Sequence, residues 1–234
     1  MASELRSILA AVAALAALPA WSAVALPGLA APAPRATGGI RGQVVALDPG
    51  PPPGRPRVSD LGGAPHDPVD RRRSVVYIEE VKRHAFDDLK PGRARLDQRG
   101  QQFIPRVLAI TVGSIVDLPN NDTTFHNAFS LSPFKTFDVG RYPPGRTRSV
   151  RFDRAGPVPV FCDIHSHMSA YVLVFSHPFF AVTDESGRYA IAAVPPGTYS
   201  LAIWSELGRA APRSITVVEG EVLEAPFQLS RGKS

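Results

Sequence analysis

The chain has 234 residues, a formal net charge of +5, 24 prolines and a single cysteine. One cysteine excludes an internal disulfide framework, and the length allows one large domain or two small ones. Beyond the first 25 residues no stretch keeps an apolar period of 3.6 residues, while Pro and Gly separate short runs rich in Val, Ile, Phe and Tyr. We therefore predict that the mature chain is all-β.

The N-terminus has the features of an export signal. A basic residue, Arg6, precedes an almost wholly apolar stretch at residues 8–20, and Ala23-Val24-Ala25 has the small-x-small pattern of a cleavage site. The stretch is shorter than the ~20 residues that span a bilayer, so we expect cleavage rather than a retained membrane anchor. The interpretation is a signal peptide at residues 1–25, a flexible tether at 26–39 and a periplasmic or otherwise exported product.

Short strands are predicted along the rest of the chain. Residues 40–47 and 74–82 have β-type composition, and the segment between them, residues 48–73, is too rich in proline for a central strand. We interpret that segment as an insertion. Further strands are predicted at residues 107–112, 115–118, 149–152, 158–161 and 171–175.

The residues with the most distinctive chemistry lie in one short run. Phe161-Cys162-Asp163-Ile164-His165-Ser166-His167-Met168 holds the only cysteine, and His126 lies in a turn-rich stretch upstream. A thiolate, two imidazoles and a weak axial thioether form the ligand set of a mononuclear electron-transfer copper site. Three alternatives stay open: a zinc site, although zinc prefers four strong ligands; a nucleophilic cysteine, which needs a pocket and an orienting group; and a buried thiol without function.

This pattern resembles the cupredoxins, in particular the short-loop amicyanin and plastocyanin type. The resemblance rests on Phe161-Cys162-x-x-His165-x-x-Met168 together with His126-Asn127 upstream. It implies a Greek-key β-sandwich at residues 40–176 that binds one type 1 copper ion through His126, Cys162, His165 and Met168. It further implies that Asn127 hydrogen-bonds to the cysteine sulfur and braces the ligand loop.

Other histidines are not expected to bind the ion. His167 departs from the family pattern, and it is an alternative ligand, a partner contact or an exposed polar side chain. His66, His84 and His177 are predicted to lie at the surface.

Residues 177–234 have a different character. Asp184-x-x-Gly187-x-Tyr189 and Pro195-Pro196-Gly197-x-Tyr199 are strong turns between short strands. They resemble the carboxypeptidase regulatory-like, transthyretin-type sandwich, which implies a smaller C-terminal β-sandwich. Modules of that kind serve as spacers, carbohydrate contacts or docking surfaces.

The predicted function is that of an electron carrier and not of an enzyme. The expected partner is an extracytoplasmic redox protein such as a dehydrogenase or a c-type cytochrome, and nucleic acid is not expected because the chain lacks a base-reading motif. A basic stretch is expected either to steer an acidic partner or to be plain solvated surface; it contains Arg141, Arg146, Arg148, Arg151 and Arg154. Two other functions remain open: copper storage or delivery without redox turnover, and a structural β-protein with a degenerate metal site.

Overall fold

The described part of the chain is built from β-strands alone. The computed structural model describes residues 36–46, 73–82, 86 and 91–230. Every helix or strand element in these ranges is a strand, which confirms the all-β prediction. Within the same ranges no helix is long and apolar enough to cross a membrane. The predicted signal peptide, residues 26–35 of the predicted tether and residues 48–72 of the proline-rich insertion lie outside the described residues.

The middle of the chain forms a β-sandwich that we call the central sandwich. One sheet has the strand order β6-β12-β11-β8-β9 and another has the order β10-β7-β3. The five-stranded sheet consists of β6 (Val107–Thr111), β12 (Ser169–Phe175), β11 (Gly156–Phe161), β8 (Phe129–Ser132) and β9 (Lys135–Asp138). The other consists of β10 (Thr147–Arg151), β7 (Ile115–Pro119) and β3 (Arg93–Arg95), and β4 (Asp97–Arg99) pairs with β5 (Gln102–Ile104).

Alternation of side chains explains how β11 and β12 bury one face. Val158 lies opposite Val172 and Val160 lies opposite Ala170 in the antiparallel register, and all four side chains are fully buried. Because successive strand residues point to opposite faces, one apolar residue in two is enough to cover the core. The core continues past the end of these strands and includes Cys162 and Met168.

The remaining strands form a second sandwich that we call the split sandwich, because its strands come from both ends of the described chain. One sheet contains β1 (Gly38–Ala46), β14 (Arg188–Val194), β17 (Val222–Glu224) and β18 (Phe227–Leu229). The other has the order β13-β2-β15-β16 and contains β13 (Phe180–Val182), β2 (Ser74–Ile78), β15 (Gly197–Ser205) and β16 (Arg213–Val217).

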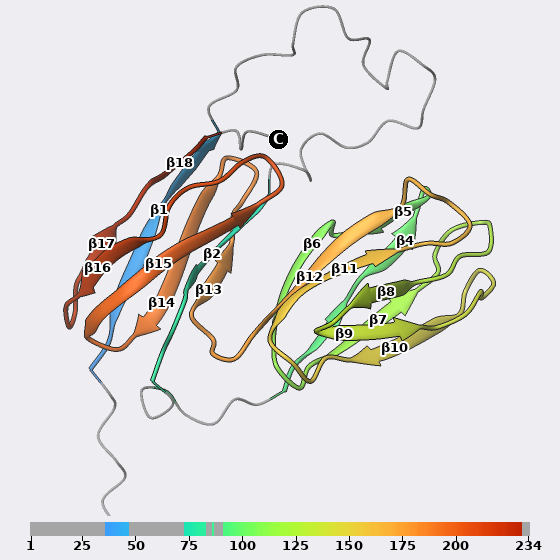
Figure 1. Cartoon of the computed structure of the whole chain (residues 1–234), viewed down its shortest axis with the longest axis horizontal. Helices are drawn as coiled ribbons and strands as arrows, with labels where there is room; N and C mark the ends of the chain where they lie inside the picture. The colour runs from blue at the N-terminus through green and yellow to red at the C-terminus, as the bar shows by residue number, and fades with distance from the viewer. Residues whose placement is uncertain (1–35, 47–72, 83–85, 87–90, 231–234) are drawn as a thin grey trace, which may run out of the picture. The chain divides into compact units, whose positions relative to one another are not determined.

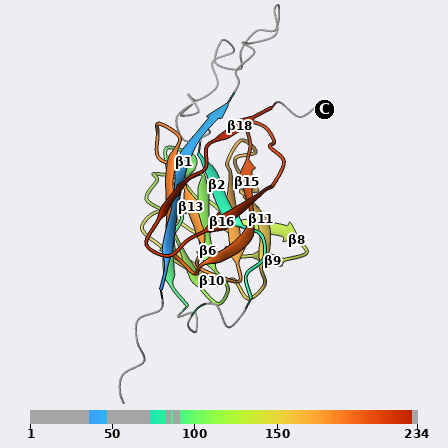
Figure 2. The ribbon, with the colours of Figure 1, turned by 90° about the vertical axis from the view of Figure 1, so that its left-hand side faces the viewer.

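The pairing of β1 and β2 corrects the predicted domain boundaries. We expected both strands in the same sandwich as the Cys162 loop, within residues 40–176. Instead, β1 pairs with β14, β17 and β18, and β2 lies between β13 and β15. Figure 1 shows the blue strand β1 among the orange and red strands from the end of the chain, and Figure 2 shows β1 and β18 side by side from another direction.

The physical reason is that strand pairing depends on contacts far apart in sequence. Periodicity identifies a strand but not its neighbour, and alternation alone does not say to which sandwich β1 belongs. One local sign of its true neighbour is Gly42, where an added Cβ would lie 2.6 Å from the backbone oxygen of Ala225. Only a glycine allows the two backbones to approach this closely.

Contacts also join residues of the two sandwiches. Val75 of β2 packs with Val107 and Leu173 of the five-stranded sheet in a third apolar cluster. Beside it, Arg106 Nε lies 2.7 Å from Glu206 Oε1, and both side chains are largely buried. This pair is better shielded from solvent than the other arginine–carboxylate pairs of the described residues, so salt screens it less.

Candidate metal centre

A short loop between two paired strands positions three of the predicted ligands. Strand β11 ends at Phe161 and β12 begins at Ser169, and these two residues are partners in the ladder. Cys162 and Met168 therefore stand at the two ends of the loop. Within it the backbone N–H of Met168 donates to the carbonyl of His165 over 2.9 Å, which closes a tight turn. The hairpin geometry holds all three residues at one end of the central sandwich.

The fourth predicted ligand comes from a separate part of the chain. His126 follows a turn after β7 and makes an isolated antiparallel bridge with Tyr142. The His126 N–H donates to the Tyr142 carbonyl over 3.2 Å, and the Tyr142 N–H donates back over 2.8 Å. His126 is fully buried. Its position is therefore set by the backbone of the sandwich and not by a mobile loop.

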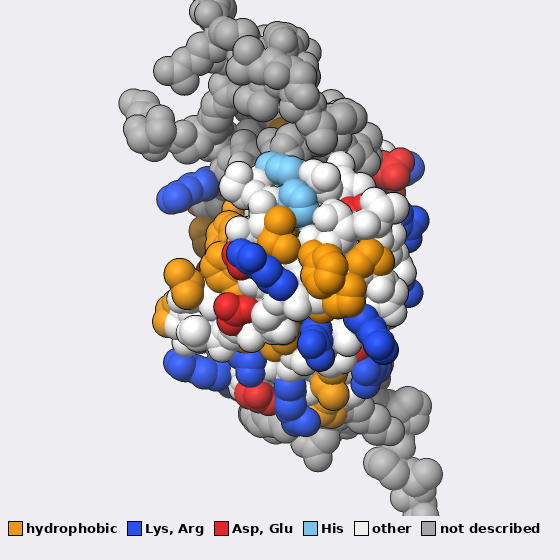
Figure 3. Space-filling model, turned by 90° about the vertical axis from the view of Figure 1, so that its right-hand side faces the viewer, with side chains coloured by type: hydrophobic (Ala, Val, Ile, Leu, Met, Phe, Trp, Pro, Cys, Tyr) orange, Lys and Arg blue, Asp and Glu red, His pale blue; other side chains and the backbone are white. Residues whose placement is uncertain are grey.

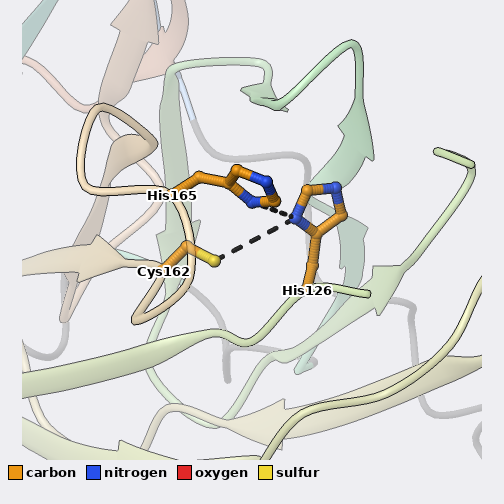
Figure 4. Close-up of side chains that lie close together, drawn as sticks. All are labelled: His126, Cys162 and His165. Atoms are coloured by element: carbon orange, nitrogen blue, oxygen red, sulfur yellow. Dashed lines mark hydrogen bonds between the residues drawn. The ribbon is translucent and has the colours of Figure 1, made fainter. Parts of the chain in front are cut away.

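Three donor atoms converge. The metal-binding atoms of His126, Cys162 and His165 all lie within 4.8 Å of one another. His126 Nδ1 lies 3.1 Å from His165 Nδ1 and 4.0 Å from Cys162 Sγ. Figure 4 shows the two rings and the thiol turned toward a common point. One soft sulfur and two imidazole nitrogens in a buried place fit a copper ion that alternates between its two oxidation states.

Asp122 orients the buried imidazole. His126 Nε2 lies 3.0 Å from Asp122 Oδ2, and the other ring nitrogen, Nδ1, faces the cysteine sulfur at 4.0 Å. Burial raises the pKa of Asp122, but hydrogen bonds from the Gln101 N–H, from His126 and from the Thr123 N–H outweigh it and leave the pKa below its usual value. The carboxylate is therefore held in the charged form that a histidine ligand favours.

A buried polar network of Tyr142, Gln98 and Asn120 supports the position of His126. The Tyr142 hydroxyl donates to the Leu118 carbonyl over 2.8 Å and accepts from the Gln98 side chain. Burial raises the pKa of Tyr142 to about 12, so it stays neutral. Asn120 donates from Nδ2 to the carbonyls of Thr124 and Tyr142. These bonds satisfy polar groups that would otherwise be costly to bury, and they fix the turn that leads to His126.

An ion pair ties the ligand loop to the same segment. Arg141 Nε lies 3.0 Å from Asp163 Oδ2. Arg141 precedes the residue that pairs with His126, and Asp163 follows Cys162 directly. Both side chains are partly or largely exposed, so the pair contributes little to stability. Its geometric effect is to link the two chain segments that carry the sulfur and the buried imidazole.

The structure places the remaining predicted site residues as follows. Met168 is buried and packs in the central core beside Cys162. Asn127 is also buried, but its Oδ1 has no hydrogen-bond partner among the described residues. No hydrogen bond of the described residues joins Asn127 to Cys162, and the bracing role of Asn127 stays a prediction.

Two other histidines differ in exposure. His177 was predicted at the surface, and this is wrong, because it is buried and its Nδ1 accepts the N–H of Phe179 over 3.2 Å. The bond closes the turn into the split sandwich. His167 is exposed, and its ring centroid lies 6.0 Å from that of His165. It does not belong to the group of converging donors.

The surroundings of His165 favour its neutral ring. Burial lowers its pKa, and the neighbouring imidazoles of His126 and His167 lower it further. A lower pKa favours the neutral ring, which is the form that coordinates a metal ion. His165 is also the partly exposed member of the converging group, whereas His126 and Cys162 are buried.

The predicted basic stretch is partly neutralised. Arg141 pairs with Asp163, and Arg151 Nε lies 2.8 Å from Asp153 Oδ1. Arg148 lies over the ring of Tyr142 at 5.9 Å from its centroid. The local positive charge is therefore smaller than the number of arginines indicates.

Sequence reasoning missed Asp122 and Tyr142 as supporting residues. The spacing of Asp122 four positions before His126 in a turn was the available signal for the first. Nothing local pointed to Tyr142, since its contact with His126 depends on the path of the chain between β9 and β10.

Comparisons with known proteins add the following findings. No family model matches the chain, and no curated protein matches it. Solved structures similar to part of it include a purple cupredoxin from Nitrosopumilus maritimus, with 22% identity over 35% of this chain and 99% of the other and a TM-score of 0.33. A point mutant of amicyanin in its Cu(I) form is 20% identical over 38% of this chain and 87% of the other, with a TM-score of 0.34.

A further similar structure is the copper-containing nitrite reductase from Thermus scotoductus SA-01. It is 23% identical, covers 48% of this chain and 27% of the reductase, and has a TM-score of 0.35.

Proposed function

We propose that this protein is an exported type 1 copper protein that carries single electrons between redox partners outside the cytoplasm. The observation that carries the proposal is the convergence of His126 Nδ1, His165 Nδ1 and Cys162 Sγ within 4.8 Å. Two imidazoles and a thiolate in a shielded place are the trigonal set of an electron-transfer copper site.

Four residues would hold the ion. His126, Cys162 and His165 supply the strong donors, and the buried Met168 is the candidate for a weak axial thioether. A bound copper ion would supply one-electron oxidation and reduction at these ligands. The chain contributes the rigidity, since His126 is held by two backbone hydrogen bonds and by Asp122.

The arrangement suits a carrier better than an enzyme. Cys162 and His126 are buried, at 4% and 0% exposure, and so are shielded from a substrate in solution. His165 reaches the surface, and its ring is the natural path for an electron that enters or leaves. Exposed apolar side chains from the neighbouring turns, Phe125 and Ile164, would supply a docking surface.

Export and partnership complete the proposal. The signal-like residues 1–25 support an exported, periplasmic location. The partner would be a dehydrogenase or a c-type cytochrome, and the net charge of +5 favours encounter with an acidic face. For the split sandwich we propose the role of a spacer or docking module of the carboxypeptidase regulatory-like type.

Two measurements test the carrier function together. Voltammetry of the copper-loaded mature protein should show a reversible one-electron wave, and a Cu(I) chelator should remove the reduced ion slowly. An irreversible wave combined with fast transfer of Cu(I) to the chelator would contradict the carrier function and favour copper delivery. A protein that binds no copper would favour a structural role.

A further inference from the structure

Two histidines lie next to each other at the surface above the buried donors. The ring centroids of His165 and His167 are 6.0 Å apart, with an angle of 64° between the rings. Figure 3 shows histidine side chains gathered on one face of the molecule, with hydrophobic side chains beside them. Of the described histidines, His167 is exposed and His165 is partly exposed, whereas His126 and His177 are buried.

The donors form a series from solvent to interior. His167 is exposed, His165 is partly exposed, and Cys162 and His126 are 4% and 0% exposed. A metal ion that arrives from solvent therefore meets His167 and His165 before it can reach the thiol. Direct capture by the buried pair would require the ion to lose its water before any protein ligand replaces it, which is costly for a charged species.

The orientation of His165 suits a ligand shared between the surface and the interior. Its Nδ1 faces His126 Nδ1 at 3.1 Å, as Figure 4 shows. Its other ring nitrogen, Nε2, takes no part in that contact. A metal ion bound to two imidazoles at ~2 Å from each nitrogen separates their ring centroids by at most about 6 Å. The observed spacing of His165 and His167 is within the reach of one ion after a small side-chain rotation.

We propose that His165 and His167 form a surface loading site that captures copper and passes it to Cys162 and His126. The inference rests on the proposed copper function and goes beyond it, since His167 is outside the converging group. The transfer is a ligand exchange without a change of oxidation state. The copper bonds to His167 and to His165 Nε2 break, bonds to His165 Nδ1, His126 Nδ1 and Cys162 Sγ form in their place, and the thiol proton leaves to solvent. His167 then stays a surface side chain in the loaded protein.

The test is the rate at which the metal-free protein acquires its copper spectrum. Stopped-flow mixing with Cu(II) follows the thiolate-to-copper absorption in wild type and in His167→Asn. Loss of one imidazole of a two-point site should slow loading by roughly tenfold or more, because the second ligand retains the ion near the first. The final spectrum should be unchanged. Ser166→Asn, an exposed neighbour on the same loop, is the matched control and should load at the wild-type rate.

Equal loading rates in wild type and His167→Asn would overturn the proposal while leaving the copper function intact. An altered final spectrum in His167→Asn would also overturn it, because His167 would then be a permanent ligand. A wild-type protein that never develops the spectrum would instead contradict the proposed function.

A second measurement tests the loading site even if the wild-type protein never develops the copper spectrum. In Cys162→Ala, Cu(II) binding followed by EPR and a chelator titration should weaken by roughly tenfold when His167→Asn is added. Unchanged affinity in the double variant would count against the site.

Discussion

The two sandwiches are built by the same alternation of strand residues, but their interiors differ in chemistry. The main cluster of the split sandwich contains only apolar and aromatic side chains, and the buried hydroxyl among them, that of Tyr189, donates to the Ala225 carbonyl. The core of the central sandwich includes a free thiol and a thioether at one end. Next to them lie buried polar side chains, which include His126, Asn127, Gln98 and Asn120.

The core of the split sandwich stabilises the fold, whereas the core of the central sandwich also borders the converging donor atoms. Burying polar groups is costly unless each finds a partner. Around His126 most groups do so, through Asp122, Asn120 and Tyr142. What remains is a set of donor atoms from His126, His165 and Cys162 that face one another. The split sandwich has no such set among its described residues.

The largest effect is predicted for a substitution that removes the sulfur donor and leaves the central sandwich intact. Replacing Cys162 by Ser should abolish the intense absorption of copper-loaded protein completely, because a hydroxyl does not replace a soft thiolate as a copper ligand. The absorption spectrum after copper addition measures this, with Ser166→Ala as a control on the same loop. An intense absorption band in the copper-loaded Cys162→Ser variant would contradict the assignment of Cys162 as the sulfur ligand.

A second substitution weakens the split sandwich and leaves the donor residues of the central sandwich unchanged. Ile78 is fully buried in the apolar cluster, so Ile78→Ala should lower the free energy of unfolding by about 2–5 kcal/mol. Urea unfolding monitors the loss. The copper spectrum of the native variant should match wild type, and a changed spectrum would show that the two interiors are not independent.

A smaller effect is expected when the support of His126 is changed. Asp122→Asn keeps an oxygen near His126 Nε2 but removes the carboxylate charge, and it should reduce copper affinity about 10–100-fold while the intense band persists. Competition with a chelator measures the affinity. Asp138→Asn alters another aspartate, the last residue of β9, which accepts the Gly140 N–H; this variant should bind copper as wild type does. Equal copper affinities of the Asp122→Asn and Asp138→Asn variants would show that Asp122 does not support the copper site.

The smallest effect concerns a turn of the split sandwich. Hydrogen bonds from the Ser186 hydroxyl and the Arg188 N–H lower the pKa of Asp184 to about 2. Because the folded pKa lies below the unfolded value of about 3.9, the carboxylate stabilises the fold above pH ~4 and loses this contribution as pH falls toward 2.

The difference in unfolding midpoint between wild type and Asp184→Asn should therefore be small at neutral pH and shrink further across that window. Unfolding curves recorded at several pH values measure it. A difference that grows as the pH falls would contradict the assignment.

The convergence of donor residues could be predicted from sequence because much of the pattern is local. Cys162, His165 and Met168 lie on one short loop between two strands whose alternation is plain, and a hairpin loop brings its own residues together. His126 was identified by residue type and by the family pattern. The structure brings it within 3.1 Å of His165.

The rest depended on long-range contacts that periodicity does not contain. The pairing of β1 with β14 and of β2 with β15 joins residues more than 100 positions apart, and the domain boundary was misplaced for that reason. The contact of Tyr142 with His126 is likewise set by the path of the chain. His177 was misjudged because a polar residue after a strand is usually exposed, whereas here it closes a buried turn.

The most direct test of the central claim is an absorption and EPR spectrum of the mature protein after Cu(II) addition and removal of excess metal. Ligation by Cys162, His126 and His165 predicts an intense band near ~600 nm and a narrow copper hyperfine splitting, both signs of a thiolate-bound type 1 ion. A weak, ordinary Cu(II) spectrum, or no bound copper, would contradict the account.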